Sequence, residues 1–311
     1  MLHHSITPAL RSLLFLMLLA PLSWAQDSAP TVPAEPVPLF KGAKVVTLWP
    51  AGHPTLKNVD QKEVLIFAEG NPERIQKLNN VHNPSIELHL APPEKANGAA
   101  VIIAVGGGNK NLGVGNEGMD VYPWLNDLGI SAFILRYRLA PHYRSDIEAL
   151  ADTQRAFRTI RAHAKEWGVD PKRVGIMGFS AGGEQAAWAS LRFDEGNPKA
   201  EDPIERESCR PDFSVLIYAG WNKMDLSSVP KNAPPIFVTS AGVDDAFHAR
   251  QSVEFYSAFF EAKIPSELHI YGHGGHGGGI SSRKGIPFGT WPMRFVEWAK
   301  DLQLMERTLQ Q

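Results

Sequence analysis

Short apolar runs rich in β-branched residues alternate with stretches of helical periodicity along most of this chain, and this alternation restricts the possible fold more than any other feature. The runs lie at 45–49, 86–90, 99–105, 132–135, 174–177, 215–218, 236–239 and 268–271. Continuous apolar strands separated by helices are typical of a mainly parallel sheet that is buried on both faces. The sequence therefore predicts an α/β fold with a mainly parallel central sheet and helices on both faces.

The stretches between the runs carry apolar residues at helical spacings of three and four positions. The clearest helix is predicted at 146–167, and others are predicted at 119–128, 181–191, 250–262 and 295–304. In open sheets of this kind ligands bind beyond the carboxyl ends of the strands. The loops that follow the strands are therefore where we look for chemistry.

The first 25 residues are predicted to be a cleaved secretory signal peptide, with an uncleaved anchor as the alternative. The apolar stretch at 13–20 is too short to span a bilayer, and Ser23 and Ala25 are small residues of the kind that signal peptidase requires. Residues 26–39, rich in proline and alanine, are predicted to be a disordered lead-in. Residues 40–311 suffice for one large domain. The protein is expected to be secreted or periplasmic, with no membrane attachment after cleavage.

Charge and cysteine content exclude several classes of protein. The formal net charge is −2 at pH 7, which gives no reason to expect binding to nucleic acid or to anionic lipid. Cys209 is the only cysteine, so an exported chain has no intramolecular disulfide and depends on its core for stability.

A serine stands between two glycines where the apolar run at 174–177 meets a helix of small residues. The segment reads Gly178-Phe179-Ser180-Ala181-Gly182, the pattern of a nucleophile elbow. A sharp strand-to-helix turn exposes the hydroxyl to both a base and a substrate. A side chain at either glycine would collide where helix and strand approach each other. The pattern also arises by chance in glycine-rich chains, so other loops must support it.

Two later strands end in loops that carry an acid and a base. Asp244 and Asp245 follow the strand at 236–239, and His273 and His276 follow the strand at 268–271. Together with Ser180 they give the chain order serine, aspartate, histidine, which is the order of the α/β-hydrolase triad. The residues alone leave Asp244 and Asp245 open. His276 is preferred as the base because it lies within a run of glycines, two before it and three after it, that lets a tight loop place it over the elbow.

The loop after the strand at 99–105 is nearly bare backbone, Gly106-Gly107-Gly108-Asn109. Its N–H groups, together with that of Ala181, are predicted to form an oxyanion hole. A plain flexible turn and a phosphate-binding turn are the alternatives, although the spacing of a dinucleotide-binding turn is not in place. The histidine pair at 273 and 276 lies on a glycine loop without a helix to direct both rings at one ion. Neither a metal nor a cofactor is predicted.

Motifs along nearly the whole mature chain resemble those of the secreted acetyl esterase and acetylxylan esterase-like branch of the α/β-hydrolase superfamily. They are Leu48-Trp49-Pro50, Asn80-Val81-His82-Asn83-Pro84, Gly106-Gly107-Gly108, Glu117-Gly118, Tyr137-Arg138-Leu139-Ala140-Pro141, Asp152-Thr153-Gln154-Arg155-Ala156, Glu166-Trp167-Gly168-Val169-Asp170-Pro171 and the elbow. The resemblance implies an α/β-hydrolase catalytic domain at 40–311. It also implies a serine esterase acting on short-chain, above all acetyl, esters of small molecules or carbohydrates.

The resemblance also implies roles for single residues. Ser180 falls on the nucleophile and His276 on the base. Asp244 is favoured as the acid, because the acid of related hydrolases precedes a helix-starting serine by eight positions and Ser252 stands at that distance. Gly107 and Gly108 are implied as backbone donors, with a register shifted by one residue as the alternative.

Some positions depart from the family pattern. Val105 and Asn109 replace residues that commonly flank the three glycines, so the acyl pocket is expected to differ, with Asn109 as a candidate substrate contact. Trp221 is a second candidate that could stack on a sugar ring, with a core or lid position as the alternative. Tyr137 and Arg138 are interpreted as structural, because an arginine in such a place usually pins neighbouring loops. A serine exopeptidase and a non-catalytic binding protein with this fold are the alternative functions.

Overall fold

The computed structural model describes residues 34–57 and 61–306, which all belong to one compact unit. The predicted signal peptide at 1–25 and the first part of the predicted lead-in lie outside the described residues. None of the helices in the described ranges is long and apolar enough to cross a membrane.

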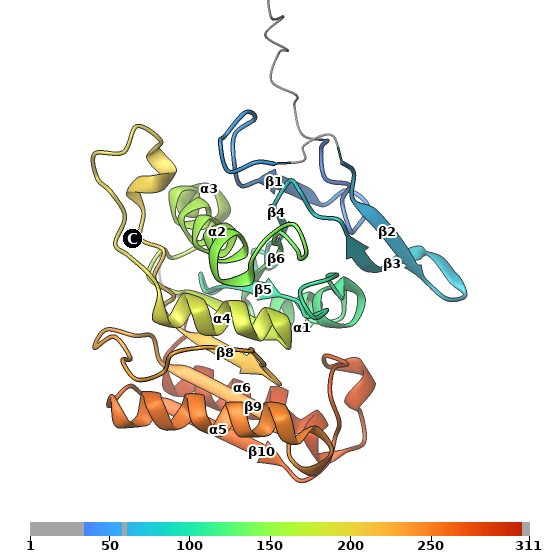
Figure 1. Ribbon diagram of the computed structural model, residues 1–311, viewed down its shortest axis with the longest axis vertical. Helices are drawn as coiled ribbons and strands as arrows, with labels where there is room; N and C mark the ends of the chain where they lie inside the picture. Colours follow the sequence, from blue (N-terminus) through green and yellow to red (C-terminus); the bar gives the residue numbers. More distant parts are fainter. Residues whose placement is uncertain (1–33, 58–60, 307–311) are drawn as a thin grey trace, which may run out of the picture. The chain divides into compact units, whose positions relative to one another are not determined.

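The core of the unit is an eight-stranded sheet with the strand order β1-β4-β6-β5-β7-β8-β9-β10 (Figure 1). β4 pairs antiparallel with both of its neighbours, and the strands from β6 to β10 pair in parallel. This sheet confirms the predicted mainly parallel architecture. Its strands are β1 (Lys44–Thr47), β4 (Ser85–His89), β5 (Ala100–Ala104), β6 (Ser131–Arg136), β7 (Val174–Phe179), β8 (Ser214–Ile217), β9 (Ile236–Ala241) and β10 (Ser266–Tyr271).

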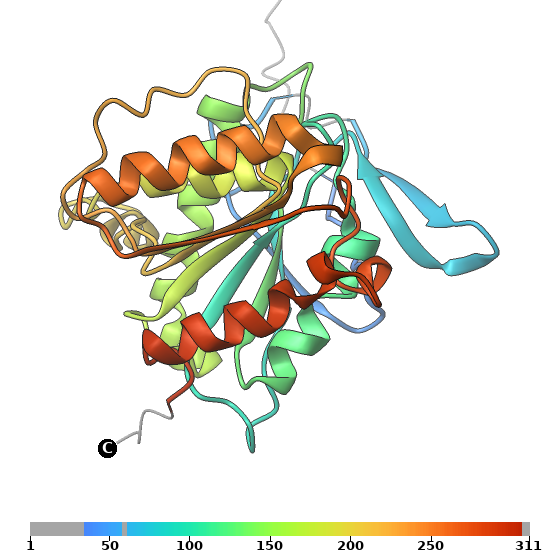
Figure 2. The ribbon, with the colours of Figure 1, turned by 90° about the horizontal axis from the view of Figure 1, so that it is seen from below.

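Helices cover both faces of this sheet, as predicted (Figure 2). On one face lie α2 (Leu150–Ala162), α4 (Ala181–Leu191) and α5 (Ala246–Glu261), and on the other lie α1 (Tyr122–Asp127) and α6 (Trp291–Asp301). The helix expected at 146–167 is divided into a π-helical turn, η2 (Ser145–Ala149), then α2 and α3 (Ala164–Trp167). The remaining short turns are η1 (Gly115–Met119), η3 (Pro203–Arg206), η4 (Val243–Asp245), η5 (Ser281–Arg283) and η6 (Pro287–Thr290).

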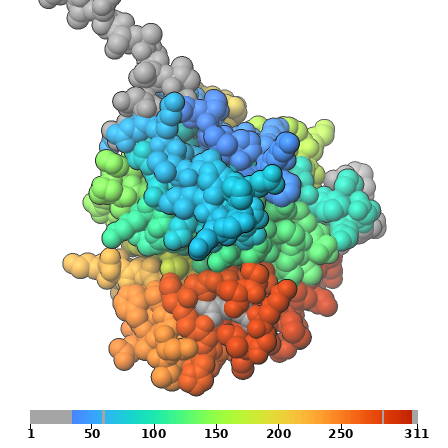
Figure 3. All heavy atoms as spheres, turned by 90° about the vertical axis from the view of Figure 1, so that its right-hand side faces the viewer, coloured from blue at the N-terminus to red at the C-terminus, as the bar shows by residue number. Residues whose placement is uncertain are grey.

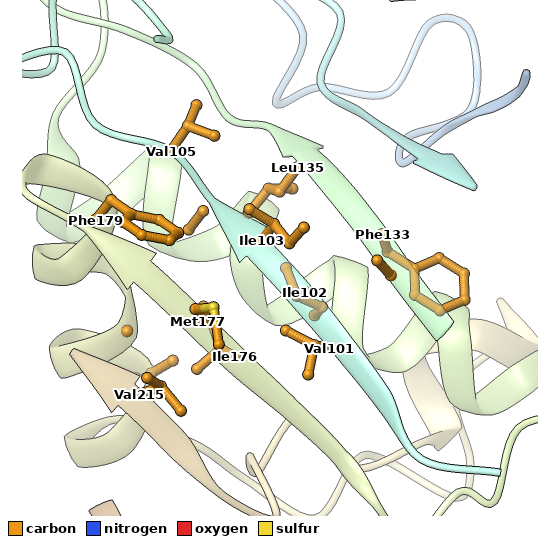
Figure 4. Close-up of a cluster of buried hydrophobic side chains, with 14 of the residues drawn as sticks. Val101, Ile102, Ile103, Val105, Phe133, Leu135, Ile176, Met177, Phe179 and Val215 are labelled. Carbon is orange, nitrogen blue, oxygen red and sulfur yellow. The ribbon is translucent and has the colours of Figure 1, made fainter. Parts of the chain in front are cut away.

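The three central strands supply the buried centre of the core (Figure 4). The side chains drawn there from β5, β6 and β7 pack against one another across neighbouring strands, and every residue of these strands is buried. Full burial of a side chain such as Ile102 or Phe133 contributes about 1.5–3 kcal/mol. Because both faces of these strands are covered, they read in the sequence as continuous apolar runs.

A hairpin of β2 (Val64–Ala68) and β3 (Asn71–Asn79) stands beside the main sheet and was not predicted. The sequence analysis did not predict it because β3 is rich in polar residues and has no continuous apolar face. Leu78 instead exchanges backbone hydrogen bonds with Leu112, and Arg74 forms an ion pair with Asp120 at 2.8 Å. Figure 3 shows the hairpin on the same side of the molecule as the orange-to-red segments from the C-terminal part of the chain.

The predicted disordered lead-in is wrong for its described part, residues 34–39. Leu39 is buried, and its N–H donates to Oε2 of Glu87 at 2.5 Å. Arg136 pairs with the same carboxylate and donates to the carbonyl oxygen of Val37. The buried pair of Glu87 and Arg136 thus also hydrogen-bonds the backbone of Val37 and Leu39, and these bonds hold a segment whose composition favours disorder. The folded body begins before Phe40.

Candidate active site

Ser180 occupies the sharp turn between β7 and α4, with φ 52° and ψ −117°. A residue other than glycine in such a sparsely populated conformation costs roughly 1–3 kcal/mol, which the surrounding packing must offset. A Cβ atom at Gly178 would lie 2.2 Å from the carbonyl oxygen of Gly182, and one at Gly182 would lie 1.9 Å from that of Ala104. The close approach predicted at both glycines is confirmed.

The sheet topology brings Ser180 together with His276, from the loop after β10. Oγ of Ser180 lies 2.9 Å from Nε2 of His276. Nδ1 of the same ring lies 3.0 Å from Oδ2 of Asp245, the residue directly before α5. The three side chains come from loops after three different parallel strands, β7, β10 and β9. The structure thus brings the predicted serine and histidine within hydrogen-bond distance.

The preference for Asp244 over its neighbour is wrong. Asp244 is exposed, and its Oδ2 accepts the N–H groups of Gly274 and Gly275, both at 2.9 Å. The hydrogen bond from Gly274 is the main reason why the pKa of the Asp244 carboxyl is lowered. The two neighbouring carboxylates of the 3-10 turn η4 therefore have different partners, and it is Asp245 that contacts the imidazole. Asp244 instead ties down the glycine loop that carries His276.

The environment of His276 favours its neutral form. Burial is the largest cause that lowers the pKa of His276 below its ordinary value of 6.5. The hydrogen bond with Asp245 acts in the opposite direction, and the nearby His248 lowers the pKa further. A neutral imidazole has one ring nitrogen free to accept a proton. Nε2, directed at the Ser180 hydroxyl, is placed to be that acceptor.

A second histidine, His248 of α5, contacts the same carboxylate. Its Nδ1 lies 2.5 Å from Oδ1 of Asp245, and its ring stacks on that of His276 with 3.9 Å between centroids and 20° between planes. Among the residues that the structure describes, these side chains form the one group of three or more His, Cys, Asp or Glu residues whose candidate ligand atoms lie within 4.8 Å of one another. The two rings are nearly parallel and both Nδ1 atoms face the carboxylate, so the arrangement is a hydrogen-bonded cluster.

The glycine loop predicted to form an oxyanion hole is fixed at both ends. The N–H of Gly106 donates to Oε2 of Glu117 at 2.6 Å, and its carbonyl oxygen accepts from Gly113 at 2.8 Å. At the other end, Nδ2 of Asn109 donates to Oε2 of Glu184 at 2.8 Å, and Ala140 donates to the carbonyl oxygen of Asn109. These hydrogen bonds fix the two ends of the loop and do not use the N–H groups of Gly107 and Gly108 in its middle.

The backbone N–H groups of Gly107, Gly108 and Ala181 donate to no acceptor within the described parts of the chain. Gly107 has φ 138°, in a region that favours glycine, and a Cβ there would lie 2.0 Å from the carbonyl oxygen of Asn111. A Cβ at Gly106 would lie 2.8 Å from that of Ser180, so the loop passes directly beside the elbow. Free donors thus flank the serine on two segments.

Glu117 and Tyr218 join the glycine loop to the histidine loop, a connection that the sequence analysis missed. The Tyr218 hydroxyl donates to Oε1 of Glu117 at 2.8 Å and accepts from the N–H of Gly279 at 3.0 Å. The Tyr218 ring also meets that of His276 edge-on, with 5.0 Å between centroids. Glu117 belonged to a motif of the family resemblance, and Tyr218 directly follows β8 at the edge of the sheet where the site lies. The role of both residues is recognised from their place in the fold and not from a sequence pattern.

The two candidate substrate contacts have other environments. Trp221 is only 6% exposed and packs against Phe255, so it belongs to the core and offers no open ring face for a sugar. Asn109 uses its amide group to hold Glu184. Arg138 is buried, forms an ion pair with Asp152 at 2.7 Å and donates to Thr55, which confirms its structural interpretation.

Comparison with known proteins shows which families and folds this chain is similar to. Residues 124–259 match the family model described as alpha/beta hydrolase fold. An acetylxylan esterase of Xylanibacter ruminicola is 32% identical over 229 residues, which cover 64% of this chain and 43% of that protein. Endo-1,4-beta-xylanase B of Butyrivibrio fibrisolvens is 27% identical over 57% of this chain and 32% of its own length. The chain therefore spans less than half the length of these curated relatives.

Among solved structures, an acetyl ester-xyloside bifunctional hydrolase of Caldicellulosiruptor lactoaceticus is 28% identical. It superposes with a TM-score of 0.69 over 84% of this chain and 97% of its own. This chain has the α/β-hydrolase fold, as predicted. The resemblance to acetyl esterases and acetylxylan esterases is confirmed as well, and ester hydrolases stand among its relatives.

Proposed function

We propose that this protein is a serine esterase that removes short acyl groups, above all acetyl groups, from carbohydrates or small alcohols through a covalent acyl-enzyme. One observation carries the proposal. The Ser180 hydroxyl, the His276 ring and the Asp245 carboxylate form a continuous hydrogen-bonded chain, with distances of 2.9 and 3.0 Å. Such a chain lets the imidazole remove the hydroxyl proton while the carboxylate holds the ring in the correct tautomer.

The proposed reaction has two halves. Ser180 attacks the ester carbonyl carbon as His276 takes its proton, and the resulting imidazolium then protonates the departing alcohol. The N–H groups of Gly107, Gly108 and Ala181 stabilise the negative charge on the carbonyl oxygen. His276 then takes a proton from a water molecule that attacks the acyl carbon, and the bond to Oγ of Ser180 breaks as His276 returns the proton to that oxygen, which releases the acid. Asp245 orients the ring and offsets its charge in both halves.

The nature of the relatives supports the choice of substrate. One is an acetylxylan esterase and another is an acetyl ester-xyloside bifunctional hydrolase, so acetylated xylan and xylose are the first substrates to test. The composition of residues 1–25 supports export by signal cleavage, in keeping with a polymeric carbohydrate substrate outside the cytoplasm.

The test compares the wild type with the S180A, D245N and D244N variants on an aryl acetate, acetylated xylan and a dipeptide anilide. We expect S180A to abolish acetate release. D245N is expected to lower kcat about 10⁴-fold, as losing the orienting carboxylate does in other triads. D244N is the matched control, since the Asp244 carboxylate contacts the loop backbone and not the imidazole. We expect this variant to lose less than about tenfold in kcat.

Two outcomes would overturn the proposal. Cleavage of the anilide without cleavage of either ester would indicate a peptidase. A wild type that is inert toward all three compounds would indicate a binding protein that retains the fold.

A further inference from the structure

Asp245 has two carboxylate oxygens, and each faces a different imidazole. Oδ2 lies 3.0 Å from Nδ1 of His276 and Oδ1 lies 2.5 Å from Nδ1 of His248. The carboxylate is nearly inaccessible to solvent, with a side-chain exposure of 7%. A buried carboxylate that accepts a hydrogen bond on each oxygen is held in one orientation, because turning it would break both bonds.

The surroundings of His248 are shaped to hold its ring. One face stacks on His276, and the ring of Phe247 meets it edge-on at 4.9 Å and 89°. The segment after β8 supplies Gly220, where a Cβ atom would lie 2.4 Å from Cδ2 of His248. Glycine at that position therefore leaves room for the imidazole, and any larger residue would displace it.

We propose that His248 is a positioning residue. It fixes the orientation of the Asp245 carboxylate and competes with His276 for the negative charge of that carboxylate. The inference rests on the proposed esterase function. Asp245 and His276 are the titratable groups in contact with His248 from the elements packed around it, η4 and the loop after β10, while Gly220 brings no side chain. One carboxylate thus serves two stacked imidazoles.

The competition has a predictable sign. His276 becomes positive each time it takes a proton in the proposed reaction, and Asp245 favours that charge while the stacked His248 opposes it. Removing the His248 ring leaves the whole carboxylate to His276, which then holds its proton more strongly. The enzyme needs neutral His276 to begin the reaction. When the pH is lowered, the variant should therefore lose activity at a higher pH than the wild type does.

The experiment records kcat/KM against pH on an aryl acetate for the wild type, H248N and H248L. The asparagine keeps a donor for Oδ1 of Asp245, so we expect kcat above pH 8 to stay within about threefold of the wild type. We expect the acid limb, the low-pH side of the profile of kcat/KM, to move to higher pH by about half a unit or more. The leucine removes donor and ring together, so a further loss of about tenfold or more in kcat is expected.

H269Q is the matched control, because His269 also contacts a carboxylate, Glu267 at 2.6 Å, but outside the site. Its profile should coincide with that of the wild type. The inference is overturned if the acid limbs of folded H248N and H248L coincide with the wild-type limb, or if all variants, H269Q included, shift alike. Those results would leave the loss of activity in S180A intact, so failure of this inference differs from failure of the proposed function.

Discussion

The carboxylate of Glu117 offers the sharpest test of how the site is held together. It accepts the N–H of Gly106 at 2.6 Å and the hydroxyl of Tyr218 at 2.8 Å, and that hydroxyl accepts the N–H of Gly279. In E117Q one acceptor oxygen becomes an NH₂ donor of almost the same size. A donor then faces either the Gly106 N–H or the Tyr218 hydroxyl, and one of the two bonds must be lost or reversed.

The magnitude follows from the kind of bond. A hydrogen bond to a charged group contributes roughly 1.5–3 kcal/mol, which corresponds to about 10- to 150-fold in rate if the loss falls on the transition state. Complete loss of one oxyanion donor costs about 10²- to 10³-fold, which sets the upper limit for a loop that is displaced but present. We therefore expect kcat of E117Q to fall about 10- to 100-fold, with KM changed by less than about threefold.

The assay is steady-state hydrolysis of an aryl acetate, with urea unfolding to confirm that the variant is folded at the assay temperature. Y218F provides the comparison, since it removes the hydroxyl that joins the two loops while leaving the carboxylate and its bond to Gly106. Its loss of kcat should be smaller than that of E117Q. A folded E117Q with kcat within twofold of the wild type would refute the idea that Glu117 holds the oxyanion loop.

Two further predictions concern the base and Trp221. Because burial lowers the pKa of His276 from 6.5, and the base must be neutral, kcat/KM should rise with pH and reach half its maximum below pH 6.5, whereas a midpoint above pH 7 would contradict this. W221A should lower the free energy of unfolding by about 3–5 kcal/mol, because Trp221 is a core residue, and should not change the ratio of activities on acetylated xylan and aryl acetate. A selective loss on xylan in a stable W221A protein would restore the sugar-stacking interpretation.

Most of the sheet could be predicted from sequence because its strands are buried on both faces and therefore appear as uninterrupted apolar runs. The elbow could be predicted equally well, since a Cβ atom at Gly178 or Gly182 would lie only 2.2 or 1.9 Å from a backbone oxygen. The β2–β3 hairpin was not accessible in this way, because backbone bonds to Leu112 and an ion pair hold it in place of a core face.

The choice between Asp244 and Asp245 depends on how one 3-10 turn is rotated, which residue spacing does not encode. His248 had a detectable signal, since it stands three residues after Asp245 at the start of a helix, where side chains at that spacing meet. Glu117 and Tyr218 meet across 101 residues of sequence, so only the fold reveals their contact.

The central claim is that acyl transfer passes through the Ser180 hydroxyl. It is tested most directly by mixing the protein rapidly with an aryl acetate, quenching in acid and locating any acetyl group by mass spectrometry of peptides. The account predicts one acetyl group on the peptide that contains Ser180, absent in S180A, together with a burst of the released phenol. Turnover by the wild type with the acetyl group on another residue, or undiminished turnover by folded S180A, would contradict it.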